Sequence, residues 1–293
     1  ENGADVAVRG GDPYATTFTD RGFSRRHPSI REHFPYLPGM LLFGVPKAVF
    51  GHHFLTDARV VFALFSLLIV GLGFAARPAP GRLWPGGALL LFVLSPGAMA
   101  LSTGGDDIPV LALLFLATVL AGSMRPGRAG LAAGGAMALK QLAWPVAVLI
   151  MISVAARDRR GAQRMVLAAG GVVTAVSLPL LSWSPTAFFA DTVQFPLGLT
   201  KVATVAASPT LGRLLSTALD GHAPAFAAAA AVGIVVFAFA VRGALASLPW
   251  AVLGAAVLLG IAVLLAPAAR FGLLVYPVHL AVCARLIALP GVR

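Results

Sequence analysis

The chain consists of long apolar runs separated by short polar breaks. Most runs approach the length of about 17 to 25 residues that crosses a bilayer core of roughly 30 Å. They lie at 36–50, 59–76, 84–101, 108–123, 129–139, 142–156, 165–183, 223–241, 248–266 and 271–288. This pattern predicts an all-α fold: a polytopic transmembrane helix bundle with about 8 to 10 membrane segments.

Three of these runs do not suit a straight spanning helix. At about 1.5 Å per residue, 129–139 and 142–156 reach only ~17 and ~22 Å. The run 36–50 contains two prolines and a lysine, and proline removes a helical hydrogen bond. We therefore expect broken or re-entrant helices at these places.

The composition agrees with a membrane protein and excludes several other classes. Apolar residues make up 58% of the 293 positions and charged residues 11%, whereas soluble domains have about 45 to 50% and about 25%. The net charge of +11 comes from arginines set singly or in short clusters between apolar runs, which does not indicate nucleic-acid binding. Cys283 is the only cysteine, which excludes a disulfide framework.

We expect two parts in the chain. Residues 1–58 form an extracytoplasmic loop with a re-entrant or juxtamembrane helix, and residues 59–293 form a single membrane domain. The sequence opens on a polar stretch without an initiator Met, so we expect a first span upstream of it.

The arginines indicate an orientation. If 36–50 is re-entrant and 129–156 is a broken hairpin, eleven basic residues fall on one side with one acid, Asp158, and the positive-inside rule makes that side cytoplasmic. They are Arg77, Arg82, Arg125, Arg128, Arg157, Arg159, Arg160, Arg164, Arg242, Arg285 and Arg293. A rival topology makes 36–50 a full span and 129–156 one continuous helix, which moves the first four of these arginines outside.

Acidic residues at the breaks are candidates for chemistry. Asp106 and Asp107 follow two glycines just before an apolar run, where they could bind a hydroxyl or a divalent metal; the alternative is a helix cap. Asp12 and Asp5 lie in the polar N-terminal stretch, where a carboxylate could act as a general base. Asp12 could instead form an Asx turn before Pro13.

Basic residues at the breaks are candidates for binding an anion. Lys140-Gln141 divides two apolar half-segments, and an ammonium at that depth is costly without an anion, water or access to the surface. A phosphate is a natural partner, and snorkelling to the interface is the alternative. Arg270 begins the last span and could make a second phosphate contact or act as an interfacial anchor.

Five short motifs, in this order between the apolar runs, carry a resemblance to a known family. They are Gly-Gly-Asp-Pro-Tyr at 10–14, Phe-Pro-Tyr-Leu-Pro-Gly at 34–39, Ser-Thr-Gly-Gly-Asp-Asp at 102–107, Leu-Lys-Gln at 139–141 and Ala-Arg-Phe-Gly at 269–272. Together they resemble actinobacterial glycosyltransferases of the GT-C superfamily that use polyprenol-phosphate sugars, specifically the family 87 (DUF2029) type.

The resemblance implies roles for these residues. A catalytic Asp lies in the first extracytoplasmic loop of such enzymes, but it precedes the Gly-Gly-Asp-Pro-Tyr motif by more residues than are present here, so Asp5 and Asp12 are substitutes for it. Asp106 and Asp107 correspond to a second acidic loop. The resemblance implies that the lipid phosphate and the substrate are bound by Lys140, Gln141, Arg270 and Tyr36.

The implied activity is transfer of a mannose- or arabinose-like sugar from a polyprenyl phosphate to a lipid or glycan acceptor. It takes place at the extracytoplasmic face of the bacterial plasma membrane, with no cofactor beyond a divalent metal at Asp106/Asp107, which the sequence leaves open. A polytopic transporter or lipid flippase would also use broken helices and intramembrane charge. That alternative predicts an internal repeat, and none is evident in the sequence. The oligomeric state stays open.

Overall fold

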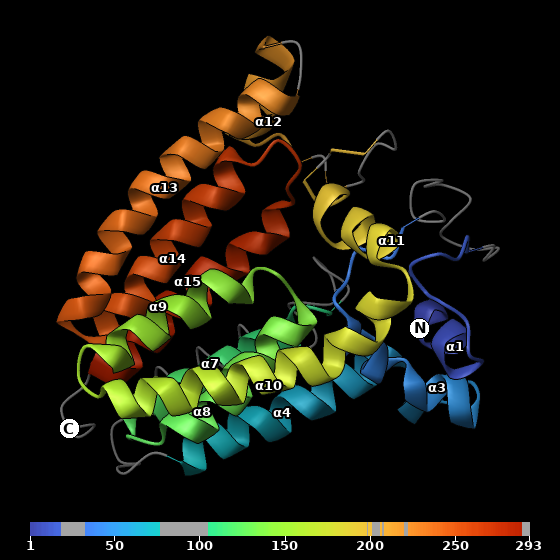
Figure 1. Ribbon diagram of the computed structural model, residues 1–293, viewed down its shortest axis with the longest axis horizontal. Coiled ribbons are helices and arrows are strands. Elements are labelled where there is room, and N and C mark those ends of the chain that lie inside the picture. Colours follow the sequence, from blue (N-terminus) through green and yellow to red (C-terminus); the bar gives the residue numbers. More distant parts are fainter. Residues whose placement is uncertain are drawn as a thin grey trace.

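A computed structural model of the chain describes residues 1–18, 33–76, 105–197, 199–200, 206, 208–219 and 222–288 (Figure 1). Every regular element in these residues is helical, as predicted. The helices are α1 (Asn2–Val8), η2 (Pro38–Phe43), α3 (Val45–Phe50), η3 (Phe54–Thr56), α4 (Ala58–Ala75), α7 (Ile108–Gly122), α8 (Pro126–Leu139), α9 (Ala143–Ala155), α10 (Arg159–Trp183), α11 (Pro185–Phe189), the π-helical η4 (Ala190–Gln194), α12 (Leu211–Ala218), α13 (His222–Ala246), α14 (Leu248–Leu265), η5 (Phe271–Leu274) and α15 (Val275–Ala288).

The described helices confirm a polytopic bundle. Five segments are long and apolar enough to cross a membrane: Ala58–Ala75, Arg159–Trp183, Phe226–Ala246, Leu248–Leu265 and Phe271–Ala288. Pro38–Phe50, Ile108–Gly122 and Ala143–Ala155 are shorter apolar helical segments. The predicted run 84–101 lies outside the described residues.

Helix α7 lies at the centre of the bundle. It is apolar on all sides, and every residue in it except Leu116 and Gly122 is buried, as expected of a helix with no polar face to present. Helices α4, α8, α9, α14 and α15 contact it. The outer helices α4, α10 and α13 expose apolar side chains such as Leu68, Leu167 and Ile234. An exposed apolar surface of this kind suits lipid rather than water.

The helix break predicted at Lys140 is present. Lys140 has an extended backbone (φ −149°, ψ 145°) at the end of α8, and Ala143 N donates to Lys140 O at 3.2 Å to close the turn into α9. Helices α8 and α9 run in opposite directions (Figure 1), so the continuous helix of the rival topology is wrong. Their lengths of 14 and 13 residues correspond to about 20 Å each.

Small residues bring α8 close to α10. Gly130 and Gly134 are four residues apart and face α10; a Cβ on Gly134 would lie 2.7 Å from Cα of Ala169, and one on Gly130 would meet the carbonyl oxygen of Met165. Such a spacing of small residues lets two membrane helices approach closely. This packing holds α8, the helix that ends at Lys140, against α10.

The charged residues separate toward the two ends of the bundle. The α7–α8 and α9–α10 connections, the C-terminal end of α13 and the end of α15 lie at the end where the chain finishes (Figure 1). In sequence these places hold Arg125, Arg128, Arg157, Arg159, Arg160, Arg164, Arg242 and Arg285. The α8–α9 turn lies at the other end (Figure 1); it begins at Lys140, and η2 packs against α8.

Candidate functional site

Lys140 is held between two carboxylates. Its Nζ lies 2.8 Å from Oδ2 of Asp106 and 2.6 Å from Oδ1 of Asp107. The three side chains are 13%, 16% and 2% exposed, respectively, so the snorkelling alternative for Lys140 is wrong. The group carries one positive and two negative charges, which leaves a net negative charge beside Asp106, the more open of the two acids.

Two tyrosines complete this group. The Tyr276 hydroxyl donates to Oδ1 of Asp107 at 2.7 Å, and the Tyr36 ring lies below the ammonium, with Lys140 Nζ 5.6 Å from the ring centroid. The negative charge of Asp106, followed by burial, raises the pKa of the Tyr36 hydroxyl. Tyr36 therefore stays a neutral hydrogen-bonding group near the acids. We call these five residues the acid–lysine cluster.

The cluster forms where several helix ends meet. Asp107 is the residue before α7, and its side chain makes no capping hydrogen bond, because it faces Lys140 and Tyr276 instead. Lys140 lies at the break after α8, Tyr276 in the first turn of α15, and Tyr36 just before η2. Neither acid therefore serves as the side-chain cap that the sequence left as an alternative.

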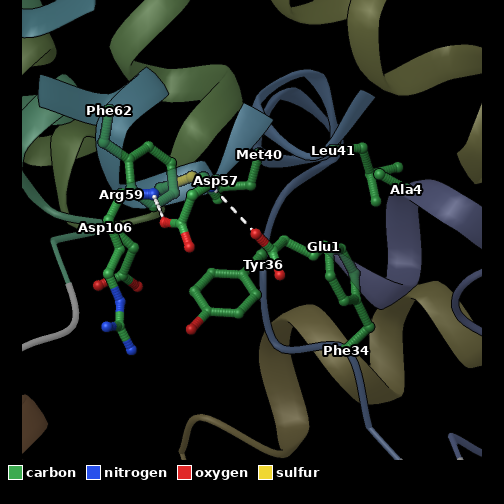
Figure 2. A pocket seen from close by; sticks show the side chains of 11 residues that line it. Glu1, Ala4, Phe34, Tyr36, Met40, Leu41, Asp57, Arg59, Phe62 and Asp106 are labelled. Carbon is green, nitrogen blue, oxygen red and sulfur yellow. Dashed lines mark hydrogen bonds between the residues drawn. The ribbon is translucent and has the colours of Figure 1, made fainter. Parts of the chain in front are cut away.

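A cavity of about 340 Å³ opens beside the cluster (Figure 2). Asp106 and Tyr36 line it from the cluster, and Asp57 and Arg59 line it from the N-terminal end of α4. Its volume falls at the lower end of the range of about 300 to 1,000 Å³ found for small-molecule sites. The acid–lysine cluster thus borders a space that can hold a small polar group.

Asp12 lies in a turn that is tied to Tyr36. Its Oδ1 accepts from Tyr14 N at 2.9 Å, which is the Asx turn considered from the sequence, and the Tyr14 hydroxyl donates to Tyr36 O at 2.8 Å. Oδ2 of Asp12 is buried and has no hydrogen-bond partner among the described residues. Buried polar atoms in folded proteins nearly always have a partner, so this oxygen calls for an explanation, such as an ordered water or a functional role.

A second buried acid, Asp191, fastens the 190–195 segment to the loop before η2. His33 Nδ1 lies 2.5 Å from Asp191 Oδ1, and Phe34 N donates to Oδ2 at 2.7 Å. Burial raises the pKa of the Asp191 carboxyl, against the opposing effect of these two hydrogen bonds. Gln141 Nε2 donates to Thr192 O, so the same segment also reaches the α8–α9 break.

The remaining predicted site residues lie apart from the cluster. Asp5 pairs with Arg9 at 3.0 Å on an exposed turn of α1. Arg270 is exposed at the start of η5, beside Ser208, whose hydroxyl accepts from Phe271 N. In the described part of the chain, neither residue forms an ion pair or side-chain hydrogen bond with the acid–lysine cluster.

Metal binding at Asp106 and Asp107 stays a prediction. The described residues contain no group of three His, Cys, Asp or Glu side chains that could hold a metal ion. The Lys140 ammonium already contacts both of the carboxylates that would have to supply the ligands. This donor set therefore does not fit a metal unless Lys140 withdraws, and we derive no step through one.

Several site residues escaped the sequence analysis. Tyr276 lies within an apolar run, where its hydroxyl gave no signal of a partner. His33 and Asp191 are 158 positions apart, so no local motif joins them. Arg59 follows Asp57 at the start of a predicted span, and a charge at that place also suits a plain interfacial residue.

The comparisons with known proteins identify the family. The model of glycosyltransferase family 87 matches residues 34–267, which is most of the chain and includes Tyr36, Asp106, Asp107 and Lys140. Asp12 and Tyr276 lie outside the matched range. A search of curated proteins and a search of solved structures found no match. The chain belongs to glycosyltransferase family 87 and is a membrane glycosyltransferase.

Proposed function

We propose that the enzyme transfers a mannose- or arabinose-like sugar from a polyprenyl phosphate to a glycolipid or polysaccharide acceptor at the extracytoplasmic face of the bacterial plasma membrane. The observation that carries this is the acid–lysine cluster beside its cavity, at the opposite end of the bundle from the arginine-rich connections. Arginines mark the cytoplasmic side, so the cluster faces outward. A lipid-linked donor reaches that face within the membrane.

The transfer is inverting. A carboxylate takes the proton of the acceptor hydroxyl while its oxygen attacks the anomeric carbon. The bond between that carbon and the phosphate oxygen breaks, and polyprenyl phosphate leaves with the electron pair. Stabilising this developing charge and positioning the two substrates supply the rate.

Asp12 is the described carboxylate best suited to act as the base. Asp106 and Asp107 both face the Lys140 ammonium, and an adjacent positive charge makes a carboxylate a weaker base. Oδ2 of Asp12, by contrast, has no partner among the described residues. Its turn is tied through Tyr14 to Tyr36, a residue that lines the cavity.

Lys140 and Gln141 hold other segments at the helix break, where Gln141 Nε2 donates to Thr192 O. Lys140 directs its ammonium at Asp106 and Asp107 and so holds both carboxylates in place. Contact with the lipid phosphate, Arg270 included, stays a prediction. No observation in the described residues favours the transporter alternative.

The test is release of polyprenyl phosphate. The full-length protein in nanodiscs is incubated with a panel of polyprenyl-phosphate sugars and membrane-derived acceptors, with and without EDTA to examine the metal. We expect release from at least one donor and a rate for Asp12→Asn at least 100-fold lower, the scale of general-base catalysis. Asp158→Asn, at the arginine-rich end, is the matched control and should keep the wild-type rate. No release from any donor would contradict the proposal.

A further inference from the structure

The cavity beside Asp106 has the lining of a site for a sugar phosphate. Aromatic rings of Phe34, Tyr36 and Phe62 form part of its wall, and a single cationic side chain among its lining residues, that of Arg59, joins them. Arg59 is exposed. Figure 2 shows its side chain extending in the same direction as that of Asp106, with the Tyr36 hydroxyl pointing toward both.

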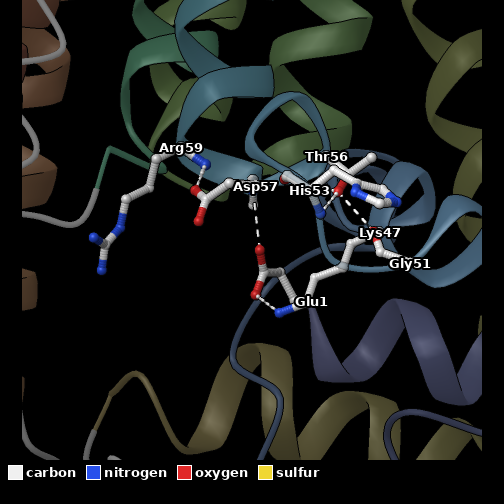
Figure 3. Close-up of polar contacts among 8 residues, drawn as sticks. Glu1, Lys47, Gly51, His53, Thr56, Asp57 and Arg59 are labelled. Atoms are coloured by element: carbon white, nitrogen blue, oxygen red, sulfur yellow. Dashed lines mark hydrogen bonds and ion pairs between the residues drawn. The ribbon is translucent and has the colours of Figure 1, made fainter.

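The carboxylates of the cavity already have partners. Glu1 accepts from Lys47 Nζ at 2.7 Å and from Ala58 N at 3.0 Å, and Asp57 caps α4 by accepting from Arg59 N at 2.9 Å (Figure 3). Asp106 pairs with Lys140 at 2.8 Å. Glu1 and Asp106 thus each have a cation partner before any ligand enters, whereas Asp57 has only a backbone donor and the acid–lysine cluster keeps its net negative charge.

The Arg59 guanidinium, unlike the carboxylates of Glu1 and Asp106, has no charged partner among the described residues. In Figure 3 its side chain points away from Glu1 and Asp57. Lys140, the cation that the sequence marked for phosphate binding, is instead bound by two acids.

We propose, on the basis of the proposed glycosyltransferase function, that this cavity holds the glycosyl-phosphate group of the donor and that Arg59 binds its phosphate. A guanidinium matches the geometry of a phosphate with two parallel N–H donors. Asp57 and Asp106 have lone pairs left for sugar hydroxyls, and the aromatic rings cover the apolar face of the sugar. Lys140 then acts as a positioning residue that holds Asp106.

Binding of a short lipid phosphate tests the role of Arg59 apart from turnover. The full-length protein in detergent is titrated with geranylgeranyl phosphate and, separately, with geranylgeraniol, which lacks the phosphate. We expect Arg59→Gln to weaken phosphate binding about tenfold, the loss of one charge-assisted contact, and to leave binding of the alcohol unchanged. The affinity of Arg59→Lys for geranylgeranyl phosphate should lie between those of Arg59→Gln and the wild type. Arg213→Gln, on α12, is the matched control and should bind as wild type.

The outcomes separate the two proposals. Equal affinity of Arg59→Gln and wild type for the phosphate, or equal weakening for phosphate and alcohol, overturns the role of Arg59. If the wild type releases polyprenyl phosphate but Arg59→Gln has an unchanged donor KM, the role of Arg59 is overturned and the proposed function stands. A wild type that releases none overturns the proposed function, whatever Arg59 binds. An Arg59→Gln variant with a raised donor KM and an unchanged kcat supports both the role of Arg59 and the proposed function.

Discussion

Lys140 Nζ and Asp107 Oδ1 lie 2.6 Å apart, although the two residues are 33 positions apart in the sequence. They come from the end of α8 and the start of α7, and the same Oδ1 also accepts from the Tyr276 hydroxyl on α15. One buried oxygen thus joins three helices. Asp106, the neighbour of Asp107 in the chain, pairs with the same Lys140 ammonium and lines the cavity.

Replacing Lys140 with Met should destabilise the protein by about 3 to 5 kcal/mol, because it leaves buried carboxylates without their cation. It should also abolish transfer. Thermal unfolding in detergent, together with donor turnover, measures both effects.

The double variant Lys140→Met/Asp107→Asn is the control for that effect. Removing the unpaired charge should recover part of the lost stability, which a double-mutant cycle quantifies. An unchanged melting temperature in Lys140→Met would mean that the ion pair is not formed in the detergent-solubilised protein.

Tyr276→Phe should cost about 1.5 to 3 kcal/mol, the range for a hydrogen bond to a charged group. Its hydroxyl is fully buried and donates to the Asp107 carboxylate at 2.7 Å. Tyr14→Phe is the matched control, because that hydroxyl donates to a neutral carbonyl at 2.8 Å. A smaller loss is therefore expected for Tyr14, about 0.5 to 1.5 kcal/mol, and a larger loss for Tyr14 than for Tyr276 would contradict the assignment.

Helix positions followed from the sequence, because lipid requires continuous apolar runs. The run 108–123 became Ile108–Gly122, and 248–266 became Leu248–Leu265. The break at Lys140 was also predicted, since a charge within an apolar run is costly. The part of the site that could be located in this way is the part that lies at helix ends.

The pairing of the charges could not be read from the sequence. Lys140 was expected to meet a phosphate, and the structure gives it Asp106 and Asp107. That contact depends on how α7 packs against α8, because Asp107 precedes α7 and Lys140 follows α8, and no sequence motif specifies that packing. The His33–Asp191 contact joins the loop before η2 to the π-helical η4, and no periodicity encodes it.

Gly134→Ala should destabilise the bundle, because the new Cβ would lie 2.7 Å from Cα of Ala169 in α10. Overpacking of this kind typically costs about 1 to 3 kcal/mol. Gly170→Ala on α10 is the matched control: a Cβ there meets nothing within 4 Å, so the change should be neutral or add about 0.5 to 1 kcal/mol of helix stability. The free energies of unfolding of the two variants, measured under the same conditions, test this expectation. Equal stabilities would show that α8 and α10 can separate freely.

Asp191 should make stability depend on pH in a direction set by its burial. Burial raises its pKa in the folded protein above the unfolded value of about 3.9. A raised pKa means that the folded state binds the proton more tightly, so the contribution is complete below the unfolded pKa and is lost as the pH rises through the folded pKa. The stability of the wild type relative to Asp191→Asn should therefore decrease from about pH 4 upward. Urea or thermal unfolding of both proteins at several pH values measures this difference. A relative stability that increased with pH would mean that the hydrogen bonds from His33 and Phe34 outweigh the burial of the carboxylate.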